Sequence, residues 1–281
     1  NMVKICKTRQ ALQTEIARLK EQNKSIGFVP TMGALHEGHL TLLRQAKQEN
    51  DIVVCSIFVN PIQFNNKEDL EKYPRQIEQD IVKIDTICDI CFTPSEQEMY
   101  PNPPQETYHF GSLETVMEGA MRPGHFNGVC IVVKRLFDLV QPNNAYFGEK
   151  DFQQLTIIRK MVQEFKLPIN IRPVAIVRAE DGLALSSRNK RLSPQARKIA
   201  PFIFQTLTQA KNNSTNMPPK QLEQWITQQF QEKSAFSLEY VQIVDANTLQ
   251  KIDKYTDAQS VIICIAVWLD NVRLIDNMFI K

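Results

Sequence analysis

Up to about residue 177, the chain alternates short apolar runs with longer stretches in which apolar residues recur every three or four positions. A short unbroken apolar run is typical of a buried strand, whereas recurrence every three or four residues is typical of an amphipathic helix. The alternation predicts βαβ units around a parallel sheet, an α/β fold of the Rossmann-like kind. In chain order, the expected elements are strands 25–29, 51–59, 87–92, 145–147 and 171–177 and helices 8–22, 39–48, 70–82, 129–140 and 152–165.

The pattern changes after Val177. Helical stretches are followed by strand-like runs that close the chain, which predicts a smaller α+β unit. We therefore expect two domains, 1–177 and 178–281, with a hinge near the S-S-R segment. The elements expected in the second domain are helices 193–210 and 219–233 and strands 238–244, 260–267 and 272–276.

Composition narrows the class of protein. Charged residues make up 23% of the chain and the formal net charge is only +2, so no clustered basic surface for nucleic acid is indicated. No apolar run approaches the roughly 20 residues that a membrane-spanning helix needs. The six cysteines lie mostly within apolar runs, as is typical of reduced core residues. We therefore expect a cytoplasmic protein that binds neither nucleic acid nor membrane.

The most informative stretch is 28–40, F-V-P-T-M-G-A-L-H-E-G-H-L, in which an apolar strand passes through a glycine-containing turn into a helix. His36 and His39 lie three residues apart at the start of that helix, so both rings lie on one face. A helix N-terminus offers unpaired N–H groups and the positive end of the helix dipole, which favour anions. Gly33 and Gly38 lack a Cβ and allow a ligand to approach the backbone. Together these features predict a phosphate-binding site.

Polar residues also occur in two other segments. Asn60 and Gln63 flank Pro61 directly after the expected strand 51–59. Amide groups both donate and accept hydrogen bonds, which suits a substrate with hydroxyl and carboxylate groups. Arg122 precedes a Pro-Gly turn. Taken singly, these residues are equally consistent with ordinary surface turns.

Two further segments carry groups suited to a nucleotide. Gly148 allows close backbone approach, and Lys150 adds a cation for phosphate. Asp151 can accept hydrogen bonds from ribose hydroxyls, and Gln154 follows about one helical turn later. The segment 185–188, L-S-S-R, combines two hydroxyls with a guanidinium. A charged loop is usually only solvated, but ligands of parallel sheets bind beyond the carboxyl ends of the strands, where several of these segments are expected.

Over essentially its whole length the chain resembles the pantoate–β-alanine ligase family. The matching segments are P-T-M-G-A-L-H-E-G-H-L, F-V-N-P-I-Q-F, Y-P-R, R-P-G-H-F-N-G-V, F-G-E-K-D-F-Q-Q-L and D-G-L-A-L-S-S-R-N. The first segment also resembles the wider nucleotidylyltransferase superfamily, whereas the combination resembles this family alone.

The resemblance implies an ATP-dependent condensation in two steps. Pantoate's carboxylate attacks the α-phosphorus of ATP to give pantoyl adenylate and pyrophosphate, and the amine of β-alanine then displaces AMP to give pantothenate. It also implies Mg²⁺ on the ATP phosphates and a homodimer. From the hinge near Val177 we expect the second domain to close over the ATP site.

The resemblance assigns roles to individual residues. His39 is expected to donate a proton to the departing pyrophosphate, while His36, Lys150, Ser186, Ser187 and Arg188 contact or neutralise the phosphates. Pantoate or β-alanine is assigned to Gln63, Gln154, Asn60 and Arg122. ATP is assigned to Met32, Gly33, Ala34, Leu35, His36, Glu37, Gly38, His39, Gly148, Glu149, Lys150, Asp151, Val177, Leu185, Ser186, Ser187 and Arg188.

One segment departs from the family pattern. The family usually has R-E-x-D-G before S-S-R, whereas this chain has R-A-E-D-G at 178–182, so no role is assigned to position 179.

Two other functions stay open: a different nucleotidylyltransferase of the superfamily, and a non-catalytic ATP-binding module. A truncated aminoacyl-tRNA synthetase is a weaker alternative, because no basic RNA-binding extension is present.

Overall fold

The computed structural model describes residues 2–281, which form two compact units. The first unit runs to Phe110 and adds Arg122–Glu149 and Gln154–Ala175. The second unit comprises Gly111–Met121, Lys150–Gln153 and Ile176–Lys281. This division differs from the expected boundary at 177/178 in that two short segments from the first part of the chain group with the second unit.

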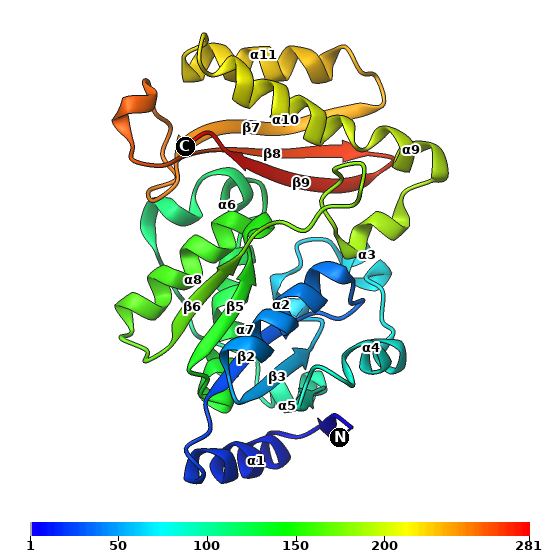
Figure 1. Ribbon diagram of the computed structural model, residues 1–281, viewed down its shortest axis with the longest axis vertical. Helices are drawn as coiled ribbons and strands as arrows, with labels where there is room; N and C mark the ends of the chain where they lie inside the picture. The colour runs from blue at the N-terminus through cyan, green and yellow to red at the C-terminus, as the bar shows by residue number, and fades with distance from the viewer. Residues whose placement is uncertain (1) are drawn as a thin grey trace. The chain divides into compact units, whose positions relative to one another are not determined.

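Six strands of the first unit form a parallel sheet within residues 2–281, in the order β1-β4-β3-β2-β5-β6 (Figure 1). Strand β2 lies between β3 and β5, so the chain leaves it towards one edge and later returns on its other side. In such a sheet the carboxyl ends of the strands at this switch point form the usual ligand site. The strands are β1 Lys4–Cys6, β2 Ile26–Thr31, β3 Ile52–Ile57, β4 Ile90–Phe92, β5 Asn144–Gly148 and β6 Asn170–Val174.

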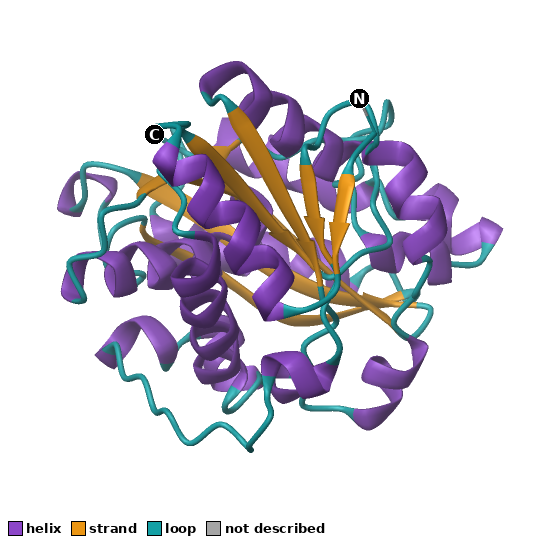
Figure 2. Cartoon of the chain, turned by 90° about the horizontal axis from the view of Figure 1, so that it is seen from below, coloured by secondary structure: helices purple, strands orange, loops and turns teal. Residues whose placement is uncertain are grey.

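Helices flank these strands (Figure 2). Leu43 and Ala46 of α2 and Ile84 of α4 are fully buried and share one apolar core with Val29 and Cys55 of the sheet. The longer helices α1 and α7 contact each other. The helices are α1 Arg9–Glu21, α2 Glu37–Glu49, α3 Lys67–Lys72, α4 Ile77–Ile84, α5 Glu96–Met99, α7 His125–Val140 and α8 Phe152–Glu164, of which α8 begins in the second unit.

Two expected helices are each divided, and in both places the reason is a proline. The single helix expected over 70–82 is wrong: α3 ends at Lys72, and Tyr73 before Pro74 is extended, with φ −62° and ψ 125°. The helical region is sterically disfavoured for a residue that precedes proline. The helix expected over 193–210 is likewise two helices, because Pro201 cannot donate a backbone hydrogen bond.

The second unit is a three-stranded antiparallel sheet, β7-β8-β9, with helices packed on it. Leu207, Leu222, Ile226 and Phe230 from the helices share one core with Ile263 of the sheet. The predicted α/β architecture with a smaller α+β part is therefore confirmed. The elements are α6 Met117–Met121, α9 Pro194–Ile199, α10 Phe202–Asn213, α11 Pro219–Gln231, β7 Phe236–Asp245, β8 Val261–Leu269 and β9 Val272–Phe279. Among the described residues, no helix has the length and apolarity needed to cross a membrane.

A buried ionic cluster explains why Gly111–Met121 belongs to the second unit. Glu118 in α6 accepts two hydrogen bonds from the Arg273 guanidinium at 2.6 Å and one from the Tyr240 hydroxyl at 2.7 Å. Arg273 also pairs with Glu239 of β7. Burial opposes the charge on Arg273, yet the hydrogen bonds that it donates to both carboxylates raise its pKa above the ordinary value. The short helix α6 is thus tied to the sheet by this ionic cluster.

Replacing Arg273 by Ala would remove the cation that pairs with the buried Glu118 and the half-buried Glu239. We expect it to lower the free energy of unfolding by about 3 kcal/mol, as is usual when one partner of a buried ion pair is removed. Urea denaturation would measure the change. The matched control is Lys72→Ala, which removes the exposed pair with Glu68 and should cost less than about 0.5 kcal/mol. Equal effects of the two substitutions would contradict a structural role for the cluster.

Candidate active site

The turn between β2 and α2 is tightly constrained. The Thr31 hydroxyl donates to the Ser56 carbonyl at 2.8 Å and accepts from the Gly33 N–H at 3.1 Å. Gly33 has φ +83°, and the next residue, Ala34, has φ +51°. A Cβ on Gly33 would lie only 3.0 Å from the Ile57 side chain, so a larger residue would be both strained and crowded.

A buried carboxylate holds this turn through hydrogen bonds to its backbone. Asp80 of α4 is fully buried and accepts hydrogen bonds from the Ala34 and Leu35 N–H groups, each at 2.9 Å. Lys83, one turn later on α4, donates to the Leu35 carbonyl at 2.8 Å. The backbone N–H groups of these two turn residues are thus committed to Asp80, and a nucleotide would have to contact other atoms of the turn.

The role of Asp80 was not predicted from the sequence, although its position in the helical pattern indicates a buried carboxylate. Ile77, Ile81 and Ile84 form the apolar stripe of a helix, and Asp80 lies within that stripe rather than on the polar face. An acidic residue at a core position must find hydrogen-bond donors, because an unpaired buried charge is very costly. The partner could not be identified from sequence, since it lies more than 40 positions away in the chain.

The two histidines cap α2, which begins at Glu37 rather than at the expected residue 39. His36 Nδ1 accepts from the Gly38 N–H at 3.0 Å, and His39 Nδ1 accepts from the His36 N–H at 3.1 Å. A backbone N–H can only donate, so both Nδ1 atoms are acceptors, and in the neutral rings the proton is on Nε2. The ring centroids are 4.0 Å apart. The turn therefore presents two Nε2–H donors close together.

The sequence H-E-G-H has a steric basis at its third position. A Cβ on Gly38 would lie 2.7 Å from Cε1 of the His36 ring. Only glycine leaves room for that ring to fold back over the helix start and accept the Gly38 N–H.

The two amide side chains that follow β3, those of Asn60 and Gln63, differ in burial. Asn60 is 1% exposed, whereas Gln63, in the 3₁₀ turn Pro61–Gln63, is half-buried. The Asn60 amide donates to Gln63 Oε1 at 2.9 Å, and the Tyr100 hydroxyl donates to Asn60 Oδ1 at 2.7 Å. Asn60 thus holds Gln63 from inside the protein. Direct contact between Asn60 and a substrate stays a prediction, for which the structure gives no exposed surface of this side chain.

The N-terminus of α7 contacts the same 3₁₀ turn. His125 Nδ1 lies 2.8 Å from the Gln63 carbonyl oxygen. A Cβ on Gly128 would lie 2.7 Å from the Ile62 carbonyl oxygen, so glycine allows the two segments to touch. Arg122 is half-buried in the turn that precedes α7.

Three more predicted residues of the first unit lie at the carboxyl end of β5 or after it. A Cβ built on Gly148 would meet no atom within 4 Å, which leaves open space beside the backbone at the carboxyl end of the strand. Glu149 follows it and is half-buried. Gln154 lies half-buried near the start of α8, whereas its neighbour Gln153 is 4% exposed and donates to the Leu113 and Val116 carbonyls.

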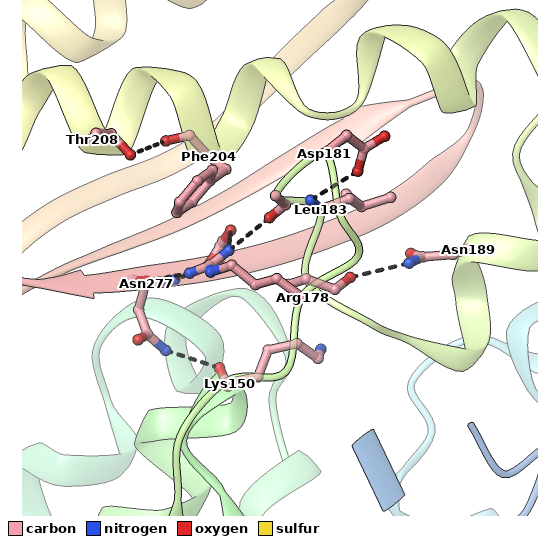
Figure 3. A network of polar contacts seen from close by, with 11 residues as sticks. Lys150, Arg178, Asp181, Leu183, Asn189, Phe204, Thr208 and Asn277 are labelled. Carbon is pink, nitrogen blue, oxygen red and sulfur yellow. Dashed lines mark hydrogen bonds and ion pairs between the residues drawn. The ribbon is translucent and has the colours of Figure 1, made fainter. Parts of the chain in front are cut away.

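The second unit carries the other predicted nucleotide-binding residues, on two segments. Lys150 is half-buried and Asp151 is exposed in a short 3₁₀ turn. The Asn277 side chain of β9 donates to the Lys150 carbonyl at 3.1 Å, which fixes the backbone and leaves the ammonium on its flexible stem (Figure 3).

The R-A-E-D-G departure lies in a short hairpin. The Leu185 N–H donates to the Val177 carbonyl at 3.0 Å, which closes the hairpin. Arg178 forms a two-pronged ion pair with Asp276 at 2.7 and 2.9 Å, and its guanidinium lies 4.4 Å from the centroid of the Phe204 ring (Figure 3). Glu180 is exposed at the tip. The structure thus gives Arg178 a clear anchoring role and the displaced acid none.

The hairpin leads into the S-S-R segment. Ser186 caps the 3₁₀ helix Ser187–Arg191, and its Oγ accepts from the Arg188 N–H at 3.2 Å. Its own hydroxyl hydrogen is therefore still able to donate. Ser187 is buried, and Arg188 and Leu185 are half-buried. The segment combines hydroxyl and guanidinium donors in a defined backbone conformation.

Asp80→Asn should loosen the β2–α2 turn. One of the two N–H groups would lose its acceptor and face the new amide N–H₂, so we expect a loss of about 1–3 kcal/mol in the free energy of unfolding. Amide hydrogen exchange would locate the change at Ala34 and Leu35. Protection at these two amides equal to that of the original chain would contradict the role given to Asp80.

Comparisons with known proteins identify the family. The family model of pantoate–β-alanine ligases matches residues 4–279. A pantothenate synthetase from Bacteroides thetaiotaomicron is 48% identical over 280 residues, covering 99% of both chains. Another, from Azobacteroides pseudotrichonymphae, is 49% identical over 278 residues and covers 98% of this chain and 99% of its own.

Solved structures agree with the sequence relatives. A pantothenate synthetase from Thermus thermophilus has a TM-score of 0.93 at 39% identity and covers 99% of this chain and 100% of its own. A pantoate–β-alanine ligase from Francisella tularensis, solved with β-γ ATP and β-alanine, has a TM-score of 0.83 at 36% identity, covering 99% and 98%. The chain therefore belongs to the pantoate–β-alanine ligase family of enzymes.

Proposed function

We propose that this chain condenses pantoate with β-alanine at the expense of ATP, through a pantoyl-adenylate intermediate. One carboxylate oxygen of pantoate attacks the α-phosphorus of ATP and expels pyrophosphate. The amine of β-alanine then attacks the acyl carbon, the C–O bond to AMP breaks, and the amine loses a proton as the amide forms. Activation is required because a free carboxylate is a poor acyl donor. The observation that carries the proposal is the pair of adjacent Nε2–H donors at the α2 N-terminus.

His36 and His39 suit the phosphates of ATP. Their Nδ1 atoms accept from backbone N–H groups, so the neutral rings offer Nε2–H to anionic oxygens at the positive end of a helix. Charge accumulates on the α-phosphate and the pyrophosphate oxygens during the displacement, and donors held in place stabilise it. To transfer a proton, His39 would first have to become an imidazolium, protonated on both ring nitrogens. Its Nδ1 would then carry a hydrogen and could no longer accept the hydrogen bond from the His36 N–H. We therefore assign both rings hydrogen-bond donation.

The donors of the second unit suit the phosphate groups of a nucleotide. Lys150 supplies a compact positive charge, and Arg188 a planar guanidinium that can bind two phosphate oxygens. Ser186 and Ser187 add hydroxyls. We assign the remaining nucleotide contacts to Gly148, Glu149, Asp151, Val177, Leu185 and the turn Met32–His39, as the family resemblance implies.

Pantoate suits the amides of the first unit. We assign its hydroxyl and carboxylate oxygens to Gln63 and Gln154, both half-buried, and a place near the small substrates to Arg122. The complex of the Francisella tularensis relative supports ATP and β-alanine as the other two substrates.

Mg²⁺ would accompany ATP. Within residues 2–281, no group of three or more His, Cys, Asp or Glu side chains is arranged to hold a metal ion. Mg²⁺ commonly keeps several waters and binds substrate phosphates with few protein ligands, so this chain's donor set is compatible with an ion that arrives on the nucleotide.

Pyrophosphate release tests the proposal. With ATP, Mg²⁺ and pantoate, we expect a burst of pyrophosphate of about one equivalent per site, which becomes continuous turnover once β-alanine is added. A different nucleotidylyltransferase would release pyrophosphate with another acceptor and not with pantoate, and a non-catalytic ATP-binding module would release none.

His39→Ala and His39→Asn separate capping from chemistry. The asparagine oxygen can take the place of Nδ1 and accept the His36 N–H, but it supplies no donor where Nε2–H was. We expect both variants to lose about a hundredfold or more in adenylation rate, as when a transition-state donor is removed. Thermal unfolding should show that His39→Asn is the more stable of the two. An adenylation rate near that of the original chain in His39→Asn would remove the Nε2–H group from the mechanism.

Gln63→Ala should affect one substrate selectively. We expect the Michaelis constant for pantoate to rise at least about tenfold, which corresponds to the loss of a hydrogen bond to a charged group, with that for ATP changed less than twofold. Steady-state kinetics with each substrate varied would show the split. An equal rise for both substrates would mean that Gln63 does not bind pantoate.

The homodimer that the family resemblance implies and the cytoplasmic location expected from the sequence stay predictions. Sedimentation equilibrium would test the first and cell fractionation the second.

A further inference from the structure

The two ends of the Gln63 amide differ in chemistry, and the structure shows which end faces the inside. Gln63 Oε1 accepts from the buried Asn60 amide at 2.9 Å. Gln63 Nε2 lies 3.5 Å from the sulfur of Met32 in the β2–α2 turn. A thioether is only a weak acceptor, so a substrate oxygen would readily take its place.

The orientation of Gln63 follows from the orientation of Asn60. Asn60 Nδ2 lies 3.1 Å from the Gly128 carbonyl oxygen in α7. A carbonyl oxygen can only accept, so the Asn60 atom that faces it must be the nitrogen. The second hydrogen of the same nitrogen points to Gln63, and therefore the Gln63 atom that receives it must be the oxygen. The donor end of Gln63 is the end left for a ligand.

Tyr100 completes this chain of hydrogen bonds. Asn60 Oδ1 is buried, and the Tyr100 hydroxyl donates to it at 2.7 Å. Without that hydroxyl the oxygen would be an unsatisfied buried acceptor, and Asn60 would lose one of the bonds that fix its orientation.

Tyr100 is itself firmly held. It is 8% exposed at the end of α5, its ring packs edge-on against Phe58 at 6.0 Å, and the Arg135 guanidinium lies 5.0 Å from its ring centroid. Burial raises the pKa of the Tyr100 phenol, although Arg135 opposes this, so the hydroxyl stays protonated and able to donate.

We propose that Tyr100 is a positioning residue which, with the Gly128 carbonyl, acts through Asn60 to make Gln63 a hydrogen-bond donor toward substrate. The inference rests on the proposed binding of pantoate by Gln63. It makes the amide selective for an acceptor, such as a carboxylate or a hydroxyl oxygen, and gives Asn60 a role without substrate contact.

A double-mutant cycle tests the relay. We would measure kcat/KM for pantoate at saturating ATP in the original chain, Tyr100→Phe, Gln63→Ala and the double variant. Loss of one hydrogen bond to a buried acceptor should lower kcat/KM about tenfold in Tyr100→Phe. The same substitution should change it less than twofold when Gln63 is already Ala, and KM for ATP should be unchanged throughout. Equal losses in both backgrounds would overturn the proposal.

Two controls keep the outcomes apart. Tyr255→Phe also removes a tyrosine hydroxyl that donates to a carbonyl, that of Met217 at 2.7 Å, and should leave kcat/KM for pantoate unchanged. Absence of pantoate-dependent pyrophosphate release in the original chain would refute the proposed function itself, before any variant is compared.

A separate variant tests whether Gln63 donates to the substrate, and it can be measured even if Tyr100→Phe does not fold. Gln63→Glu keeps the shape but places an anionic oxygen where the Nε2–H group was. If Gln63 must donate, this variant should lose at least as much kcat/KM for pantoate as Gln63→Ala. A value within twofold of the original chain would show that no donor is needed at this position.

Discussion

The hydrogen bonds between the Asp80 carboxylate and the Ala34 and Leu35 N–H groups are the constraint on which the β2–α2 turn depends. A turn at the carboxyl end of a parallel sheet carries backbone donors that helix and strand do not satisfy. Two of them are buried here, and leaving each unsatisfied would cost about 1–3 kcal/mol. The Asp80 carboxylate of α4 accepts from both N–H groups and so holds Gly33 and Ala34 in their left-handed conformations. This conformation of the turn determines where α2 begins and where its two histidines lie.

Internal hydrogen bonds also orient three of the proposed contact residues of the first unit. His36 and His39 each use one ring nitrogen to accept from the backbone, and Gln63 uses its oxygen to accept from Asn60. In each group the acceptor atom receives a hydrogen bond from within the protein, and the donor atom is the one that we assign to the ligand. ATP and pantoate are both rich in anionic and hydroxyl oxygens, so a set of donors with fixed orientation suits them without reorganisation. In the second unit, Ser186 follows the same logic through its capping bond from the Arg188 N–H.

Sequence patterns predicted the parts of the fold that depend on local periodicity. Alternating apolar runs and helical stretches indicated the parallel sheet and the smaller α+β part, and the H-E-G-H spacing placed two imidazoles on one helix start. The three-residue strand β1 was missed because it is too short to show a period. The helix expected over 70–82 is wrong because Pro74 interrupts it, although the apolar spacing on both sides is helical.

The supporting residues could not be predicted, because their partners are far away in sequence. Asp80 pairs with residues 45 and 46 positions earlier, and Tyr100 with a residue 40 positions earlier. Nor does local pattern show that Glu118 pairs with Arg273, 155 positions later, which is why the segment Gly111–Met121 was expected in the first domain. Sequence indicated which side chains carry the chemistry, and the structure was needed to show what orients them.

Oxygen-isotope transfer tests the central claim most directly, because only attack of pantoate on the α-phosphorus links its carboxylate covalently to AMP. Pantoate labelled with ¹⁸O in both carboxylate oxygens would be incubated with the enzyme, ATP, Mg²⁺ and β-alanine, and the products analysed by mass spectrometry. The account predicts one ¹⁸O atom in each AMP formed and the other in the amide carbonyl of pantothenate. Unlabelled AMP, or ¹⁸O in inorganic phosphate with formation of ADP, would contradict an acyl-adenylate mechanism.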